Sequence, residues 1–289
     1  MRLGWPPLAA TDERDAPPVA SADEMSELLH LNQTGHSAAF FDLDRTLISG
    51  SSAFVFGVSA WRADMLPSKQ FARDAVSAIA FKLRGDKGGD VVAKIRERIL
   101  GAVTGLSQDS LVGLNETIVP KLLERVRPES KQLLDLHRRQ GRATYIISAS
   151  PKELVEPLAM ALGMTDGIGT VSEVVDGHYT GELVGPFCYG EGKVEAIVEI
   201  AKWEGFDLRQ CYAYSDSISD LPMLEAVGHP VAVNPDGRLN QIALQRGWPI
   251  VIFARRTKRV IRRTTAGVGT AALTAGAFSA GWRLSARRR

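Results

Sequence analysis

The fold of this 289-residue chain is decided by one stretch, Ala38-Ala39-Phe40-Phe41-Asp42-Leu43-Asp44-Arg45-Thr46-Leu47. Its first four residues form a short, continuous apolar run, which is typical of a strand buried on both faces of a parallel sheet. Side chains alternate along a strand, so Asp42 and Asp44 point the same way if the extended geometry continues. Two carboxylates on one side repel each other unless a cation shares the site. Asp42 and Asp44 follow the carboxyl end of this strand, and ligands of open α/β sheets bind at the carboxyl ends of the strands. The pair therefore predicts a Mg²⁺ site with a carboxylate that can act as nucleophile or acid.

Asp-x-Asp on its own also fits sites of different kinds. Turns favour Asp without any chemistry. An EF-hand loop is excluded, because Leu47 stands where that loop has its sharp-turn glycine. The Asp-x-Asp of sugar-nucleotide transferases stays open on these residues alone. The rest of the chain has to decide between these classes.

Charge is divided unevenly along the chain. Ten of the 35 Lys and Arg residues lie from Ile252 to Arg289, where there is no acid. The remainder has 25 basic and 33 acidic residues, a net charge of −8. An acidic body with a basic tail indicates an anionic partner for the tail. Nucleic acid is not expected, because no motif or aromatic context accompanies the arginines.

The tail also contains 19 uncharged residues, Thr264 to Trp282, flanked by arginines. This length is about enough to span a bilayer, but small residues dominate and large apolar ones are few. A spanning helix, a helix lying flat on anionic lipids, a helix packing on protein and a disordered tail are all compatible with the pattern. We favour membrane association without choosing between spanning and lying flat.

Residue usage favours a cytoplasmic protein, attached to the inner face of the membrane if the tail binds there. The N-terminus lacks the basic start and apolar core of a signal peptide, and residues 1–36 are expected to form a flexible arm. Cys188 and Cys211 are expected to be reduced. No zinc site is predicted, because the five histidines are scattered without the spacing of metal ligands.

Apolar residues recur at helical spacing between residues 51 and 127, and no strand pattern interrupts them. The block is expected to be a helical insert that forms a cap over the acids. One of its helices is predicted from about Ser110 to Val126, with Pro120 kinking or splitting it. Pro128 opens a further helix that Gly141 ends. Asp176-Gly177 predicts the turn of a β-hairpin.

Polar residues follow two more buried strands. The strand at 143–148 ends in Ser148, where hydroxyl and backbone N–H groups can bind an anion, although a plain helix N-cap is the commoner use. The strand at 210–214 is followed by Asp216 and Asp220, again at a carboxyl end. Between them Lys193 begins a helix after Gly190, without the pattern of a P-loop. Lys193 is either a surface residue or a positive charge for a phosphate.

Taken in order over about residues 37–253, these pieces resemble the haloacid dehalogenase superfamily, in its phosphoserine-phosphatase-like branch. The family motifs are matched by Phe41 to Thr46, by Ser148, by Lys193, and by Asp216 with Asp220. The resemblance implies an α/β fold, a three-layer αβα Rossmann-like parallel sheet with a helical cap inserted after the first strand. The implied domains are a core at 37–50 and 128–253, a cap at 51–127, the arm at 1–36 and the tail at 254–289.

The resemblance implies a Mg²⁺-dependent phosphomonoester hydrolase that acts through an aspartyl-phosphate on a small phosphorylated metabolite. Asp42 would be the nucleophile, and Asp44 would protonate the leaving oxygen and then activate water. Mg²⁺ would be held by Asp42, the backbone carbonyl of Asp44 and Asp216.

The remaining motif residues would bind and orient. Ser148 and Lys193 would contact the phosphoryl oxygens, and Lys193 would also keep Asp42 ionised. Asp220 would orient Lys193 or a metal-bound water.

The substrate is where this sequence departs from the family. Phosphoserine phosphatases carry a Glu just after the first motif, which meets the substrate amino group, and the matching position in this chain is Ser51. A hydroxyl cannot pair with an ammonium as a carboxylate does. Arg98 stands near the position of the cap arginine that reads the substrate carboxylate. L-Phosphoserine is therefore one candidate substrate. A phosphotransferase or mutase, and a non-catalytic regulatory membrane-associated protein, stay open as alternatives.

Overall fold

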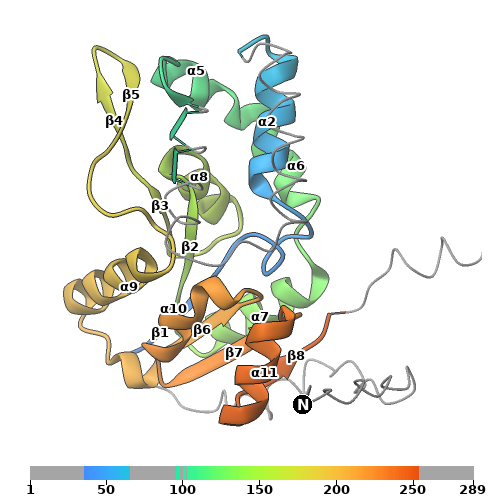
Figure 1. Ribbon diagram of the computed structural model, residues 1–289. Coiled ribbons are helices and arrows are strands. Elements are labelled where there is room, and N and C mark those ends of the chain that lie inside the picture. Colours follow the sequence, from blue (N-terminus) through green and yellow to red (C-terminus); the bar gives the residue numbers. More distant parts are fainter. Residues whose placement is uncertain (1–35, 66–95, 98–99, 102, 254–289) are drawn as a thin grey trace, which may run out of the picture. The chain divides into compact units, whose positions relative to one another are not determined.

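The computed structural model describes residues 36–65, 96–97, 100–101 and 103–253 (Figure 1). The chain divides into two compact units, residues 1–252 and 253–289, and the helices and strands described below belong to the first. Three predictions fall largely or wholly outside the described residues: the N-terminal arm, the cap residue Arg98, and the basic tail. No helix within the described part of the chain is long and apolar enough to cross a membrane.

Six parallel strands form the central sheet, in the order β3-β2-β1-β6-β7-β8. They are β1 (Ala38–Phe41), β2 (Ala143–Pro151), β3 (Asp166–Thr170), β6 (Tyr212–Ser215), β7 (His229–Val233) and β8 (Ile250–Val251). All four residues of β1 are buried, as their apolar character predicts. The chain runs outward from β1 to β3 and then returns to build β6 to β8 on the other side. The strand order therefore reverses between β1 and β6, which is where open α/β sheets bind their ligands.

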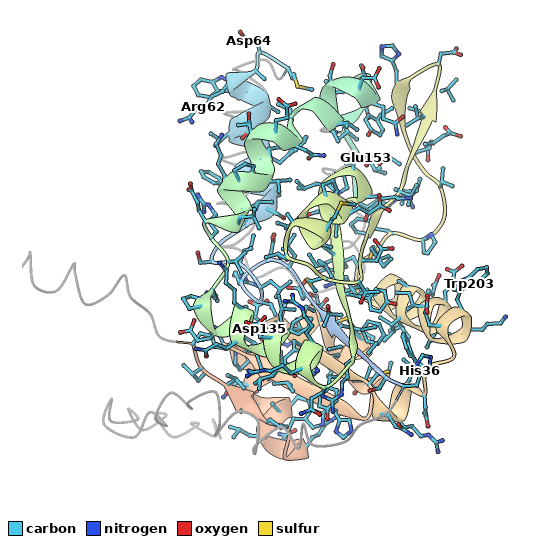
Figure 2. The ribbon with its side chains drawn as sticks, turned by 180° about the vertical axis from the view of Figure 1, so that it is seen from behind. His36, Arg62, Asp64, Asp135, Glu153 and Trp203 are labelled. Atoms are coloured by element: carbon cyan, nitrogen blue, oxygen red, sulfur yellow. The ribbon has the colours of Figure 1, made fainter. Side chains whose placement is uncertain are left out.

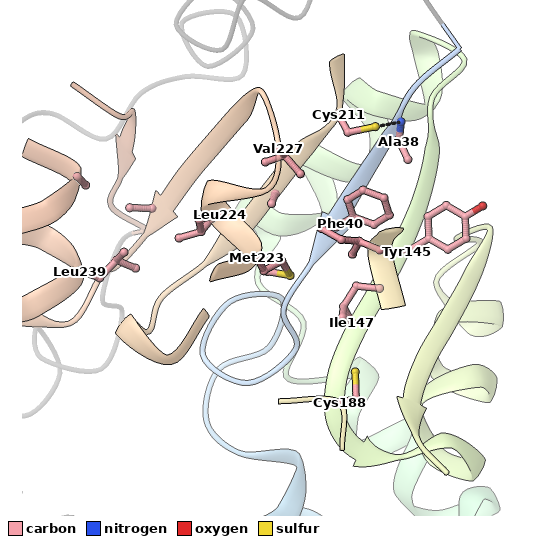
Figure 3. Close-up of a cluster of buried hydrophobic side chains, with 14 residues drawn as sticks. Ala38, Phe40, Tyr145, Ile147, Cys188, Cys211, Met223, Leu224, Val227 and Leu239 are labelled. Carbon is pink, nitrogen blue, oxygen red and sulfur yellow. Dashed lines mark hydrogen bonds between the residues drawn. The ribbon is translucent and has the colours of Figure 1, made fainter. Parts of the chain in front are cut away.

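Helices cover both faces of this sheet, so the three-layer prediction is confirmed. The helices of the core are α7 (Pro128–Arg139), α8 (Lys152–Ala161), α9 (Glu191–Glu204), α10 (Leu221–Glu225) and α11 (Gly237–Arg246). Phe40 points into a cluster with Met223, Leu224 and Leu239, which come from α10 and α11 (Figure 3). The next residue, Phe41, points to the opposite face because side chains alternate along the strand.

On that opposite face, α7 packs an aromatic layer against the sheet. The rings of Phe41 and Tyr214 stack with centroids 4.5 Å apart. His137 from α7 is fully buried against them, and its Nε2 lies 2.7 Å from the Tyr214 hydroxyl. Burial lowers the pKa of His137 to about 3, and the positive charge of Arg142 adds to this effect. His137 is therefore neutral in the folded protein at neutral pH.

The described part of the cap consists of α2 (Ser52–Arg62), α5 (Gln108–Gly113) and α6 (Asn115–Leu123), all inserted between β1 and β2. The cap contacts the start of α8 through Glu153 (Figure 2). Asn115 Nδ2 donates to the Glu153 carbonyl at 2.6 Å, and Gln108 Nε2 lies 3.4 Å from its carboxylate. These bonds join cap helices to the helix that follows Ser148.

A β-hairpin, β4 (Ser172–Val175) and β5 (His178–Leu183), lies beside the cap (Figure 1). Its turn is at Asp176-Gly177, as predicted, and both residues have positive φ angles, 49° and 77°. Backbone hydrogen bonds join the hairpin to the cap: Gly105 N donates to Tyr179 O at 2.8 Å, and Tyr179 N donates to Leu106 O at 3.0 Å. The residues just before α5 are thus hydrogen-bonded to the hairpin, which follows β3 of the core sheet in the chain.

Two features differ from the sequence predictions. The helix expected from Ser110 to Val126 is two helices, and the break falls at Leu114 rather than at Pro120, which lies inside α6. The break follows Gly113, a poor helix former.

Strand β3 was not predicted, because two glycines interrupt its apolar pattern. Both glycines have a tertiary cause, since the backbone of α8 passes close to them. A Cβ on Gly167 would lie 2.5 Å from the Val155 carbonyl oxygen, and one on Gly169 would lie 2.7 Å from the Lys152 backbone.

Candidate active site

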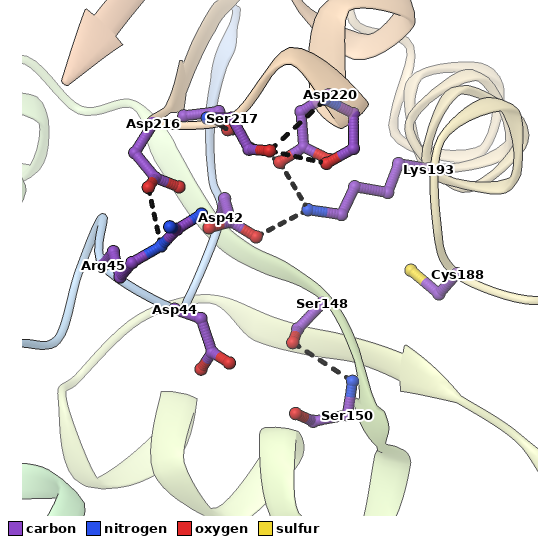
Figure 4. Close-up of polar contacts among 12 residues, drawn as sticks. Asp42, Asp44, Arg45, Ser148, Ser150, Cys188, Lys193, Asp216, Ser217 and Asp220 are labelled. Atoms are coloured by element: carbon purple, nitrogen blue, oxygen red, sulfur yellow. Dashed lines mark hydrogen bonds and ion pairs between the residues drawn. The ribbon is translucent and has the colours of Figure 1, made fainter. Parts of the chain in front are cut away.

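The turn after β1 directs the first two acids to the carboxyl edge of the sheet. Asp42 N donates to Tyr214 O at 2.9 Å, which extends the β1–β6 pairing by one residue. The chain then closes on itself, with Ile48 N donating to Leu43 O at 3.1 Å. Arg45 reverses the chain direction with a φ of 64°. Figure 4 shows Asp42, Asp44 and Arg45 together at this edge.

Lys193 joins the first motif to the last. Its Nζ lies 2.6 Å from Asp42 Oδ1 and 2.8 Å from Asp220 Oδ2 (Figure 4). The Lys193 and Asp220 side chains are each only 3% exposed, and that of Asp42 is 12% exposed. A buried ammonium is thus shared between two carboxylates, which reduces but does not cancel their combined negative charge.

The pKa values reflect this excess of negative charge. Burial raises the pKa of Asp42 to about 7, against the opposing effect of Lys193 and with the help of the charges on Asp220 and Asp44. The carboxylates of Asp220 and Asp42 raise the pKa of Lys193 above its ordinary value and outweigh the effect of burial on it. Lys193 therefore stays charged.

Asp220 is itself held by a serine that the sequence analysis did not select. Ser215 is fully buried at the end of β6, and its Oγ donates to Asp220 Oδ2 at 2.7 Å. Ser217 N in turn donates to Ser215 Oγ at 3.2 Å. The sequence signal that could have found Ser215 is its position, directly before Asp216 at the end of a buried strand.

Asp216 lies next to these residues and is also buried. Its Oδ2 is 2.8 Å from Arg45 Nε (Figure 4). Burial raises the pKa of Asp216 to about 6; Arg45 opposes this shift, and the charges of Asp220 and Asp236 add to it.

Asp236 fixes the backbone around Asp216. Its N–H donates to the Asp216 carbonyl at 2.7 Å, and its Oδ2 accepts from Ile218 N at 2.8 Å. Its Oδ1 caps the start of α11 by accepting from Leu239 N at 2.9 Å. In the sequence Asp236 stands in Asn234-Pro235-Asp236-Gly237, which predicts a turn and gives no sign of its contacts around Asp216.

Asp44 lies against the N-terminus of the first cap helix. Ser52 N donates to Asp44 Oδ1 at 2.8 Å, and Ser51 Oγ donates to Asp44 Oδ2 at 3.1 Å. A carboxylate at this place satisfies a free N–H group at the start of α2 and interacts favourably with the helix dipole. Ser51, selected from the sequence as a substrate-contacting position, is a hydrogen-bond donor to Asp44 in the structure.

Ser148 lies at the same edge, because it follows Ile146 of β2, the residue that pairs with Phe41 of β1 (Figure 4). Its Oγ accepts from Ser150 N at 3.2 Å. Ser150 Oγ is 2.8 Å from Ser52 Oγ, and both of these side chains are buried. The predicted phosphate-binding turn is therefore in direct contact with the first residue of the cap helix α2.

The arrangement suits a hard divalent cation. The Asp42 and Asp216 carboxylates and the Asp44 carbonyl would supply oxygen donors, which Mg²⁺ prefers. Burial destabilises both charged carboxylates, so a cation between them would compensate for their charge. No three His, Cys, Asp or Glu side chains gather as a metal site among the described residues. The proposed set needs only two side chains, because its third donor is a backbone oxygen.

The fold and these motifs define a class of protein, the hydrolases with an aspartate pair at the end of the first strand. A model of the haloacid dehalogenase-like hydrolase family matches residues 39–225. The chain belongs to this family.

Relatives agree on the branch. The chain is 41% identical over 253 residues to a probable phosphatase of Mycobacterium tuberculosis, covering 84% of this chain and 88% of that protein. It is 39% identical over 227 residues to the phosphoserine phosphatase SerB1 of the same organism, covering 78% and 74%. A Bordetella pertussis structure of unknown function has a TM-score of 0.67 at 28% identity and covers 75% and 99%. The predicted phosphoserine-phosphatase-like branch is confirmed.

Proposed function

We propose that this protein is a Mg²⁺-dependent phosphomonoester hydrolase that acts through an aspartyl-phosphate at Asp42 on a small phosphorylated metabolite. One observation carries the proposal: Lys193 contacts Asp42 and Asp220 at 2.6 and 2.8 Å inside a buried site. Such a lysine opposes the effect of burial and favours the ionised Asp42 carboxylate, which a nucleophile requires, and it adds positive charge where a phosphoryl group would arrive. The family and the probable phosphatase among the relatives support the same reaction.

In the first step the Asp42 carboxylate attacks phosphorus, and a new carboxylate oxygen–phosphorus bond forms. The bond between phosphorus and the substrate oxygen breaks, and its electron pair goes to that oxygen. Asp44 donates the proton that the leaving alcohol needs. Ser51 Oγ and Ser52 N keep the Asp44 carboxyl group in place for this transfer.

In the second step water attacks the phosphorus of the aspartyl-phosphate. Asp44, now ionised, accepts the proton from this water, and the bond between phosphorus and Asp42 breaks. Phosphate leaves and both aspartates return to their starting states. Ser148 and Lys193 contact the phosphoryl oxygens throughout.

Mg²⁺ would be held by Asp42, the Asp44 carbonyl and Asp216. When bound, it supplies positive charge that compensates for the repulsion between the carboxylates and the phosphate.

L-Phosphoserine is a candidate substrate, supported by the phosphoserine phosphatase among the relatives. Against it, the position of the amino-group-binding Glu is taken by Ser51, whose hydroxyl bonds to Asp44. Arg98, the candidate for the substrate carboxylate, lies outside the described residues. The proposal therefore extends to other small phosphate esters, including those without an amino group.

The test is phosphate release from a panel of esters: L-phosphoserine, an amino-alcohol phosphate, glycerol phosphates, sugar phosphates and lysophosphatidate. Each is assayed with Mg²⁺ and with EDTA. We expect Mg²⁺-dependent release that Asp42→Asn abolishes. Asp135→Asn is the matched control, because Asp135 is an exposed acid on α7 (Figure 2). Full turnover by Asp42→Asn would disprove the proposal, and phosphate appearing on an acceptor alcohol would indicate a phosphotransferase.

The basic tail at 254–289 is proposed to attach the protein to an anionic membrane surface. Its ten basic residues within the last 38 of the chain, with no acid among them, support this role. Vesicles with and without phosphatidylglycerol, sedimented with the full chain and with a chain ending at residue 253, test it. We expect co-sedimentation only with the full chain and the anionic vesicles.

A further inference from the structure

Arg45 is a cation next to a proposed metal ligand. Its Nε lies 2.8 Å from Asp216 Oδ2. The Asp216 side chain is 5% exposed and that of Arg45 is 53% exposed. The buried carboxylate therefore has a guanidinium that reaches it from solvent (Figure 4).

The backbone at Arg45 supports a role for this side chain. Its φ of 64° lies in the left-handed region, which is unfavourable for a residue with a Cβ and is usually occupied by Gly, Asn or Asp. The turn itself is closed by Arg45 N donating to Gly50 O at 3.1 Å, a bond that a glycine would make equally well. The arginine is therefore not required by the turn, and its guanidinium contact with Asp216 is the feature that distinguishes it.

We propose that Arg45 is a built-in counter-ion that competes with the divalent cation for Asp216 and thereby lowers the metal affinity of the site. The inference rests on the metal site of the proposed function. Arg45 acts through Asp216 and is a positioning residue. Without metal, its guanidinium balances the buried charge of Asp216 and holds that side chain in place.

Metal binding changes this balance. A divalent cation bound to Asp216 repels a guanidinium a few ångströms away, so the Arg45 contact has to weaken or break when the metal enters. Part of the binding free energy is spent on this displacement. Because the Arg45 side chain is half exposed, it can move into solvent, which keeps the effect moderate.

Metal affinity measured without substrate tests the inference. Mn²⁺ is the probe, because it uses the same oxygen ligands and its free form is measured directly by electron paramagnetic resonance. Arg45→Gln removes the charge at nearly the same length, and Arg45→Lys keeps the charge. Arg246→Gln is the matched control. Arg246 is 45% exposed and pairs with Glu225, and it ends α11, about 15 Å along the helix from Asp236.

We expect Arg45→Gln to bind Mn²⁺ about three- to tenfold more tightly than the wild type, and Arg246→Gln and Arg45→Lys to stay within about twofold of it. The difference between Arg45→Gln and the wild type should shrink as KCl is raised, because salt screens a half-exposed charge. Combining each protein with Asp216→Asn should remove the difference.

Thermal melting gives a second measurement. Without metal, Arg45→Gln should melt below the wild type, because Asp216 has lost its cation. At saturating Mn²⁺ the two melting temperatures should converge. If Arg45 had a purely structural role, Arg45→Gln would melt below the wild type both without metal and at saturating Mn²⁺.

Unchanged or weaker Mn²⁺ binding by Arg45→Gln would overturn the inference, as would Arg45→Lys binding as tightly as Arg45→Gln. If no variant binds Mn²⁺, the inference fails together with the metal site. If Mn²⁺ binds as expected but no ester is hydrolysed, the inference stands and the proposed hydrolase activity fails.

Discussion

Replacing Lys193 by Met tests how far the site depends on its buried ammonium. The side chain is 3% exposed and makes two charge-assisted contacts, with Asp42 and Asp220. Methionine has a similar length and no charge, so the substitution leaves two buried carboxylates without their cation. Breaking a buried ion pair from one side costs about 3–5 kcal/mol. The expected loss in the free energy of unfolding is of that size, which a domain with a stability of about 5–15 kcal/mol can survive.

Urea denaturation at neutral pH in the presence of EDTA measures this loss. Lys152→Met is the matched control, because Lys152 is 47% exposed and pairs with Glu156 one helical turn away. Such a pair contributes only about 0.3–0.5 kcal/mol. Adding Asp220→Asn to Lys193→Met should recover part of the loss, because one of the two unpaired carboxylates is then neutral. Mg²⁺ should also recover part of it by compensating for Asp42.

A cost for Lys193→Met no larger than that for Lys152→Met would refute this reasoning. The same conclusion would follow if Asp220→Asn made Lys193→Met still less stable. Either result would mean that the carboxylates do not rely on Lys193 for their charge balance.

Three further predictions concern other parts of the molecule. The pKa of His137 is about 3 in the folded protein and its ordinary value is 6.5. Between pH 3 and pH 6.5, His137 is therefore protonated in the unfolded state and neutral in the folded state. The stability due to neutral His137 is present above pH 6.5 and falls by about 1.4 kcal/mol per pH unit below it, so urea titrations of His137→Gln and wild type should converge towards low pH. Ser51→Ala should lower kcat about tenfold with little change in KM, because it removes one donor from Asp44; a raised KM with unchanged kcat would make Ser51 a substrate contact. Gly167→Ala should cost about 1–3 kcal/mol in urea denaturation, because its Cβ would lie 2.5 Å from the Val155 carbonyl oxygen, and a neutral effect would contradict that packing.

Much of the fold was predictable from short-range signals. The apolar run before Asp42 predicted a buried central strand, and β1 is one. Helix α7 begins at Pro128 and ends just before Gly141, and Asp176-Gly177 forms the hairpin turn. Each of these signals lies within a few residues of the feature it controls, through fixed φ angles, missing donors or side-chain alternation. The acids at the carboxyl ends of β1 and β6 were also visible, because parallel strands bring those ends to one edge.

Tertiary packing determined the features of the fold that short-range sequence signals did not predict. Strand β3 was not predicted, because its two glycines are explained by the close approach of the α8 backbone and not by residues near them in the sequence. Tertiary structure also decided which residues meet. Lys193 contacts Asp42 across 151 residues of chain. Ser215, Asp236 and Arg45 make their contacts only with groups that folding brings to them.

The sequence by itself predicted the architecture from local periodicity and from residue types at strand ends, and its resemblance to a known family indicated the type of chemistry. Only the tertiary structure decided that Ser51 holds Asp44, and that Arg45 faces Asp216. The physical reason is that a contact between side chains depends on distance and burial after the chain has folded, and neither can be read from spacing along the sequence.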